Sequence, residues 1–388
     1  MAKFFILIVL FFSISVAAQT EFFHSKINLS ENKLEEFYSS FSIDDAQVYF
    51  NANDYQVYAY DKKTGDLNWS YYSGYKTNTA PISVQEKLFS RITDGKLLQM
   101  NPKNGDTIQT LKIEKLYTPP FFKDNIMYCA AILPEIGGAI LAYDLNTNNI
   151  LWQKYIGHGA SYQPYFLKDK IVARFEDMFW FELDYNGNAL DKSENCYSKN
   201  TEPPFEEYFC NIQYDIVNQY HKDLATKNVT IDETKYYYGA NATVVLKGNK
   251  LKIINNKNKV ATEISIDKII TLLETEANDY TAILKVEENT VWFIYENILA
   301  VYDFKNNKTV KAFDLSKWNP HQVILDGNNL WLISRKDGEL VGLKLELDPA
   351  DEAIRAAKAK LFNQTHQCGN EAEALNEARK KALDTVKK

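Results

Sequence analysis

Residues 55–69 read Tyr-Gln-Val-Tyr-Ala-Tyr-Asp-Lys-Lys-Thr-Gly-Asp-Leu-Asn-Trp, and this stretch decides the fold. Two sets of side chains alternate along residues 56–61, as they do in a strand with two different faces. Asp61 and Gly65 then supply the side-chain hydrogen bond and the permissive φ angle that a tight turn requires. A returning strand follows and places Trp69. The stretch predicts a β-hairpin, which needs neighbouring units because a single hairpin cannot bury its own apolar face.

The hairpin recurs along the chain. The residues that open its turn are spaced by 40, 43 and 40 positions, at Asp61, Asn101, Asp144 and Asp184. Less regular units follow at 243–255, around Asp303 and at 322–345. A fixed period of about forty residues, with several strands per unit, is typical of propeller blades. The sequence therefore predicts an all-β fold, a single β-propeller of about seven four-stranded blades. Six or eight blades remain open, because the segment without a period could hide a blade and residues 20–50 could supply a closing strand.

The flanking segments differ from the repeats. Ser30 begins either a short capped helix or an irregular lead-in strand. Asp348 and Pro349 suit the N-cap and the first position of a helix, and a second Ala-rich helix follows it. The predicted organisation is a signal peptide at 1–18, a lead-in segment at 19–45, a propeller at 46–348 with an insertion at about 192–236, and a C-terminal α-helical hairpin at 349–388.

Residues 1–18 combine one lysine, an apolar run and the small residues Ala17 and Ala18, which is the pattern of a cleaved secretory signal peptide. The alternative is a membrane anchor, for which the run is short and lacks a basic flank. No cysteine follows the small residues, so nothing indicates a lipid anchor. Loss of Lys3 leaves 43 basic and 51 acidic residues, a net charge of −8. We expect a periplasmic or secreted protein, not membrane-spanning after cleavage, and the acidic balance argues against nucleic acid as a partner.

The chain has four cysteines, at positions 129, 196, 210 and 368. In an oxidising compartment an even number is compatible with disulfides. Cys196 and Cys210 bracket a short polar segment and are the candidate disulfide, whereas the pairing of Cys129 and Cys368 stays open. A zinc site is the alternative, but the cysteines lack Cys-x-x-Cys spacing and the five histidines are scattered.

The units at 59–69 and 142–152 resemble the repeat of PQQ-like (quinoprotein alcohol dehydrogenase-like) β-propellers, which reads apolar–Ala–apolar–Asp–x–x–Thr–Gly–x–x–x–Trp. The resemblance covers about residues 45–347 and implies structural roles for the repeat positions. In such propellers the indole packs between neighbouring blades and the Asp–Gly turn fixes the hairpin. The positions concerned are Asp61, Gly65, Trp69, Asp144, Trp152, Asp184 and Asp303.

The same resemblance leaves two functional branches. One contains quinone-dependent dehydrogenases with an adjacent-cysteine disulfide and a calcium site; the other contains cofactor-free binding propellers, such as a periplasmic scaffold for outer-membrane protein assembly. The sequence has no adjacent cysteines and no recognisable calcium cluster, nucleophile elbow or zinc-protease motif. We therefore expect an exported, non-catalytic protein with no cofactor, catalytic or metal-binding residues, which binds another envelope protein or a peptide. A carbohydrate-binding propeller, favoured by the aromatic content, and a quinoprotein dehydrogenase are the alternatives.

Overall fold

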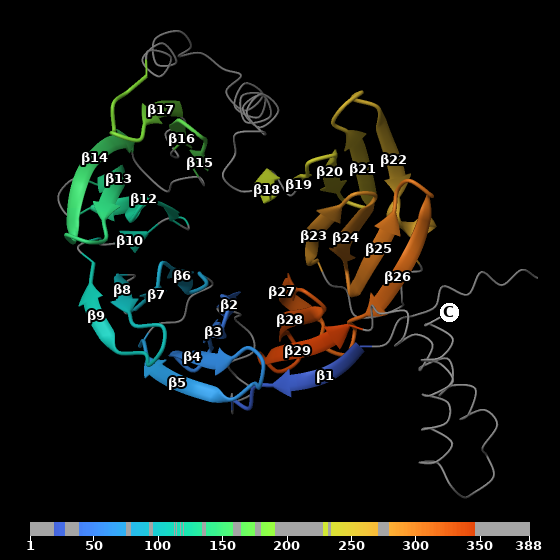
Figure 1. Ribbon diagram of the computed structural model, residues 1–388, viewed down its shortest axis with the longest axis horizontal. Helices are drawn as coiled ribbons and strands as arrows, with labels where there is room; N and C mark the ends of the chain where they lie inside the picture. The colour runs from blue at the N-terminus through green and yellow to red at the C-terminus, as the bar shows by residue number, and fades with distance from the viewer. Residues whose placement is uncertain are drawn as a thin grey trace, which may run out of the picture.

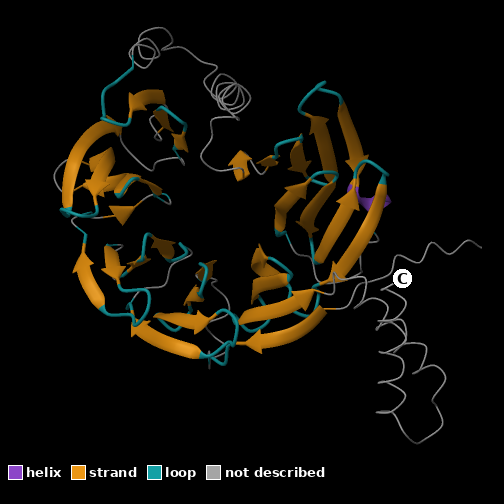
Figure 2. Ribbon diagram, viewed as in Figure 1, coloured by secondary structure: helices purple, strands orange, loops and turns teal. Residues whose placement is uncertain are grey.

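The computed structural model describes the chain over residues 19–27, 39–74, 79–92, 96–133 (except residues 112, 114, 117 and 119), 137–157, 164–174, 180–190, 228–231, 234–270 and 279–345. Over these residues the fold is almost entirely β (Figure 2), with one short 3₁₀ helix, η3, at Ile266–Lys268. The strands form seven antiparallel sheets that follow one another around a ring, whose described part is interrupted between residues 190 and 228 (Figure 1). The expected all-β propeller architecture is confirmed, whereas the number of blades in the whole chain stays a prediction.

The first half of the ring contains four sheets. Their strands are β2 (Ser40–Ile43), β3 (Gln47–Asn51), β4 (Gln56–Asp61) and β5 (Leu67–Tyr72); β6 (Ile82–Val84), β7 (Lys87–Arg91), β8 (Leu97–Met100) and β9 (Thr107–Thr110); β10 (Lys115–Leu116), β11 (Phe121–Lys123), β12 (Ile126–Leu133), β13 (Gly137–Asp144) and β14 (Asn149–Gly157); and β15 (Tyr165–Phe166), β16 (Lys170–Arg174) and β17 (Trp180–Asp184).

The second half contains three sheets. Their strands are β18 (Asn228–Ile231), β19 (Thr234–Tyr238), β20 (Ala242–Lys247), β21 (Lys250–Asn255) and β22 (Ala261–Ser265); β23 (Thr281–Glu287), β24 (Thr290–Tyr295), β25 (Ile298–Asp303) and β26 (Lys308–Asp314); and β27 (Pro320–Asp326), β28 (Asn329–Ser334) and β29 (Leu340–Leu345), which are joined by β1 (Gln19–His24).

In each repeat unit the chain enters on an inner strand and leaves on an outer one (Figure 1). The β27–β29 sheet departs from this rule, because its outermost strand is β1 from the other end of the chain. β1 pairs antiparallel with β29, with Gln19 opposite Leu345 and Phe23 opposite Gly342. The expectation that the N-terminal region could supply a closing strand is confirmed.

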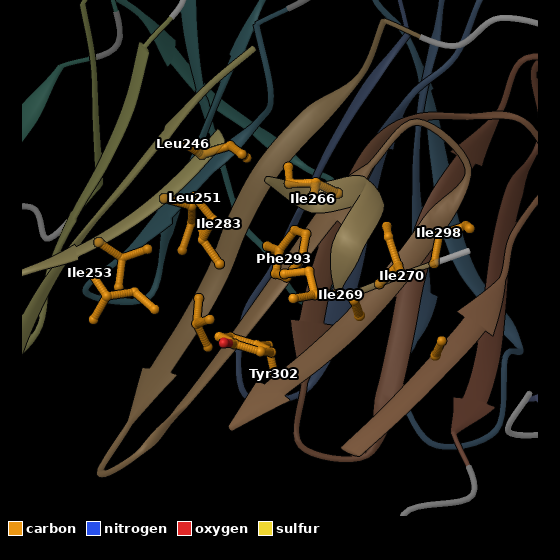
Figure 3. Packing of buried hydrophobic residues seen from close by; sticks show 14 of the residues in the cluster. Leu246, Leu251, Ile253, Ile266, Ile269, Ile270, Ile283, Phe293, Ile298 and Tyr302 are labelled. Atoms are coloured by element: carbon orange, nitrogen blue, oxygen red, sulfur yellow. The ribbon is translucent and has the colours of Figure 1, made fainter. Parts of the chain in front are cut away.

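The core lies between neighbouring sheets. Figure 3 shows one such interface, where Leu251 and Ile253 of β21 lie near Ile283 and Phe293 of the next sheet, and all four are buried. Burying apolar side chains such as these contributes about 1.5–3 kcal/mol each to the free energy of unfolding. Because each such core is shared between two sheets, a sheet does not have a complete core of its own.

The structure corrects one expectation from the sequence, and several other expectations concern residues that it does not describe. Residues 228–231 and 234–238 form β18 and β19 of a regular sheet, so this part of the segment expected as an insertion at 192–236 belongs to the ring. Cys129 is unpaired and buried, and burial raises the pKa of its thiol. The signal peptide, the helix after Ser30, the candidate Cys196–Cys210 disulfide and the hairpin at 349–388 lie outside the described residues.

A buried carboxylate holds the segment that follows β1. Glu339 accepts hydrogen bonds from the hydroxyl of Ser25 and, at 2.7 Å, from the backbone N–H of Ile27. The Ser25 hydroxyl oxygen accepts from the N–H of Leu340 at 2.9 Å. Burial raises the pKa of Glu339 to about 7; the charge of Asp337 adds to the increase, and the hydrogen bonds and His24 oppose it. This group, here called the closure clasp, ties both ends of the ring together.

The raised pKa makes the stability of the closure depend on pH. Between the unperturbed value of 4.5 and the folded value of about 7, the folded chain retains a proton that the unfolded chain has released. The free energy of unfolding therefore decreases as pH rises through this window. We expect Glu339→Gln to lower this slope, measured by urea denaturation at several pH values. The exposed Glu263 provides the control: Glu263→Gln should keep the wild-type slope, and a full slope in Glu339→Gln would contradict the assignment.

Candidate functional site

The predicted turn residues form the turns expected of them. The Asp61 carboxylate accepts hydrogen bonds from the backbone N–H groups of Lys63 and Thr64, both at 2.8 Å. These bonds from Thr64 and Lys63 lower the pKa of Asp61. Gly65 closes the turn with a φ of +77° and donates its N–H to the Asp61 carbonyl at 2.9 Å. The same acceptor role falls to the other turn-opening carboxylates, Asp144, Asp184 and Asp303.

The two repeat tryptophans connect neighbouring sheets. Trp69 on β5 is 8% exposed, and its Nε1 donates to the carbonyl of Pro102 in the next sheet at 2.8 Å. Its ring lies directly over Gly105, where an added Cβ would come within 2.7 Å of Trp69 Cε3. Trp69 therefore makes both an apolar and a polar contact with the turn of the following sheet.

Trp152 on β14 makes the same kind of contact between the β10–β14 sheet and the β15–β17 sheet. Its Nε1 donates to the carbonyl of Tyr185 at 3.0 Å, and a Cβ on Gly187 would approach Trp152 Cδ2 to 2.6 Å. Both tryptophans thus contact the turn of the following sheet through the ring and through the indole N–H.

Two other residues occupy the same position and were missed from the sequence. Phe23 of β1 covers Gly65, whose added Cβ would lie 2.7 Å from Phe23 Cδ2. Gln109 of β9 donates from Nε2 to Oδ1 of Asn148, a turn residue with a φ of +57°. Gln109 stands eight residues after its turn-opening residue, Asn101, as Trp69 does after Asp61, and this spacing was the available signal.

The close contact between a turn glycine and the ring above it can be tested by adding a methyl group to the glycine. We expect Gly65→Ala to lower the free energy of unfolding by about 1–3 kcal/mol, because the left-handed backbone becomes strained and the methyl group meets Phe23. Gly327→Ala is the matched control, since Gly327 has a φ of +60° and no atom within 4 Å of the added Cβ. Gly327→Ala should lower the free energy of unfolding by less, because it introduces backbone strain alone. Equal decreases for the two variants in chemical denaturation would show that the contact with the Phe23 ring contributes nothing.

The candidate binding site is a pocket of about 410 Å³, here called the inner pocket, on β18, β19, β23 and β27 of three successive sheets. Its lining comprises Asn228, Thr230, Lys235, Tyr236, residues 280–284 and residues 323–325. Alternate residues of a strand point to opposite faces, so the continuous runs on β23 and β27 indicate that strand edges line the pocket. β18, β23 and β27 are the terminal strands of their sheets, and among the described residues each pairs with a strand on one side only.

Polar groups in the inner pocket are few and defined. The hydroxyl oxygen of Tyr280 accepts the backbone N–H of Val323 at 3.1 Å, which links β27 to the chain just before β23. Burial raises the pKa of Tyr280 to about 12, so its hydroxyl stays protonated at neutral pH and keeps a proton to donate. Lys235 is the one charged residue of the described lining and gives the pocket a positive charge. The arrangement suits an extended polypeptide with a carboxylate.

The described residues contain no group of three or more His, Cys, Asp or Glu side chains that could hold a metal ion. Nor does any helix in this part of the chain have the length and apolar character needed to cross a bilayer.

Comparison with known proteins agrees with the repeats. A model of the family of outer membrane protein assembly factor BamB matches residues 29–119, which contain the first two turn units. The match is confined to these units, whose turn pattern resembles that of PQQ-like β-propellers. No curated protein matches the chain.

Two solved structures are similar to this chain at low identity. The computationally designed Ika8 protein is 14% identical, with a TM-score of 0.48, over 84% of this chain and 99% of that chain. BamB from Moraxella catarrhalis is 11% identical, with a TM-score of 0.32, over 79% of this chain and 70% of that chain.

Proposed function

We propose that the chain is an exported, non-catalytic propeller that binds an extended segment of another envelope protein or a peptide in the inner pocket. The observation that carries the proposal is the meeting of the terminal strands of three sheets at one pocket. Free strand edges bind peptides by adding a strand, in which main-chain hydrogen bonds supply affinity and side-chain pockets supply specificity.

The charge and the neighbours of the site suit such a ligand. Lys235 stands in a pocket of an otherwise acidic chain and would pair with an acidic side chain or a terminal carboxylate. Thr230, Thr281 and Tyr236 offer further hydrogen-bonding groups at the wall. The match to the family of outer membrane protein assembly factor BamB supports a scaffold role in the periplasm, which requires the signal peptide expected at 1–18.

The test is an affinity pull-down from the envelope extract of the source organism with the mature chain and the double variant Lys235→Glu, Thr281→Arg. The variant reverses the charge of the pocket and fills its wall, so we expect it to lose a protein that the wild type captures. The control, Lys247→Glu, Thr110→Arg, makes the same changes at exposed positions of β20 and β9 and should retain the partner.

Equal capture by all three proteins would contradict binding in the inner pocket. A chain ending at Asp348, run alongside, would show whether residues 349–388 contribute to the contact. If no protein is captured, a glycan array tests the carbohydrate alternative, for which the exposed Tyr72 and Tyr155 are the available aromatic platforms.

A further inference from the structure

A second pocket, of about 440 Å³, lies between the β18–β22 sheet and the β23–β26 sheet. It is separate from the inner pocket and shares no residue with it. Ile253, Val260 and Thr262 line it from one sheet, and Asn289 and Phe304 line it from the next. We call this pocket the seam slot.

The strand register places Thr262 where the repeat tryptophans stand in other sheets. Trp69 lies opposite Ala59, which is two residues before the turn-opening Asp61. Thr262 lies opposite Ile253, which is likewise two residues before the turn-opening Asn255. Trp152 opposite Ala142 repeats the relation in the β10–β14 sheet. The seam slot therefore opens at the position that an indole fills elsewhere in the ring.

The partner group of the indole is also in place. Trp69 and Trp152 donate to the carbonyls of Pro102 and Tyr185, each the residue directly after the turn-opening residue of the next sheet. In the sheet that follows Thr262 the turn opens at Asp303, and the corresponding residue is Phe304, which lines the slot. An acceptor carbonyl and an aromatic neighbour are thus present without the tryptophan.

The slot is open to solvent on the turn side. Thr262 is exposed, whereas Trp69 at the equivalent position is 8% exposed, and Val260 at the entrance is 60% exposed. Behind Thr262, Ile253 is buried in the interface core (Figure 3), so the floor of the slot is apolar. Asn258 and Glu288 border the entrance with polar groups that suit the main chain next to an inserted side chain.

We propose that the seam slot binds one aromatic side chain, best an indole, presented by a partner polypeptide. The slot offers the same groups as the interfaces between sheets that contain a tryptophan. These groups are an apolar floor, a neighbouring turn and a carbonyl that accepts the indole N–H. Aromatic anchors that enter a preformed pocket are a common source of binding energy at protein interfaces. The proposal rests on the repeat geometry and not on the inner pocket.

The test uses N-acetyl-L-tryptophanamide as the probe and the full mature chain as the receptor. We expect saturable binding at about 1 mM by NMR titration, with N-acetylglycinamide giving no response. Thr262→Trp supplies the missing indole from the chain itself, so it should raise the melting temperature and weaken probe binding by at least about tenfold. Thr110→Trp adds an indole at an exposed position of β9 and should leave probe binding unchanged.

If Thr262→Trp does not fold, Thr262→Lys serves instead. Lys311 stands opposite Val301 at the equivalent position of the β23–β26 sheet, so a lysine is compatible with this site. It should also lay its side chain across the slot and weaken the probe by at least about tenfold. The proposal is overturned if the wild type shows no saturable binding up to about 10 mM, or if the variant that folds binds the probe as tightly as the wild type.

Discussion

The sheets of this chain depend on burial against their neighbours. All five residues of β3 and all four residues of β8 are buried, so neither strand has a face that water could cover. A sheet with two apolar faces in a linear row would leave one face exposed at each end of the row. Closing a row into a ring removes such ends. The β1–β29 pairing joins the two ends of the chain in one sheet, and this sheet packs against the β2–β5 sheet.

The residue at the position of Trp69 differs from sheet to sheet, and so does the contact that it makes with the next turn. Trp69 and Trp152 make an apolar contact and a hydrogen bond with the next turn, Phe23 makes the apolar contact, and Gln109 makes a hydrogen bond to an asparagine side chain. These contacts differ in the apolar area they bury, so the interfaces between sheets differ in the free energy that stabilises them. A ring built in this way opens first where its seams are weakest.

Much of this arrangement follows from local sequence. The turn around Asp61 and Gly65 was predictable because its hydrogen bonds join residues within four positions of each other, and the indole of Trp69 was placed by the same spacing. Phe23 could not be assigned, because the strand with which it pairs lies more than three hundred residues away and no turn connects them.

The candidate site was less accessible to prediction for a related reason. The inner pocket joins residues near 230, 281 and 324, and its lining includes strand edges, which have no side-chain signature in the sequence. Residues 228–238 have no turn-opening residue of the repeat type, so their strands were taken for part of an insertion. The seam slot was hidden too, because it is defined by a residue that departs from the repeat.

The pairing of β1 with β29 also sets an order of events in time. Gln19 leaves the ribosome, and crosses any membrane, long before its partner Leu345 exists as folded chain. Until then β1 lacks the strand with which it pairs in the folded chain. Contacts between such distant residues are slow to form, and unpaired strands associate with other chains. The β1–β29 pairing therefore forms late, when the whole chain is available. Until it forms, the molecule must be kept apart from other chains with which its unpaired strands could associate.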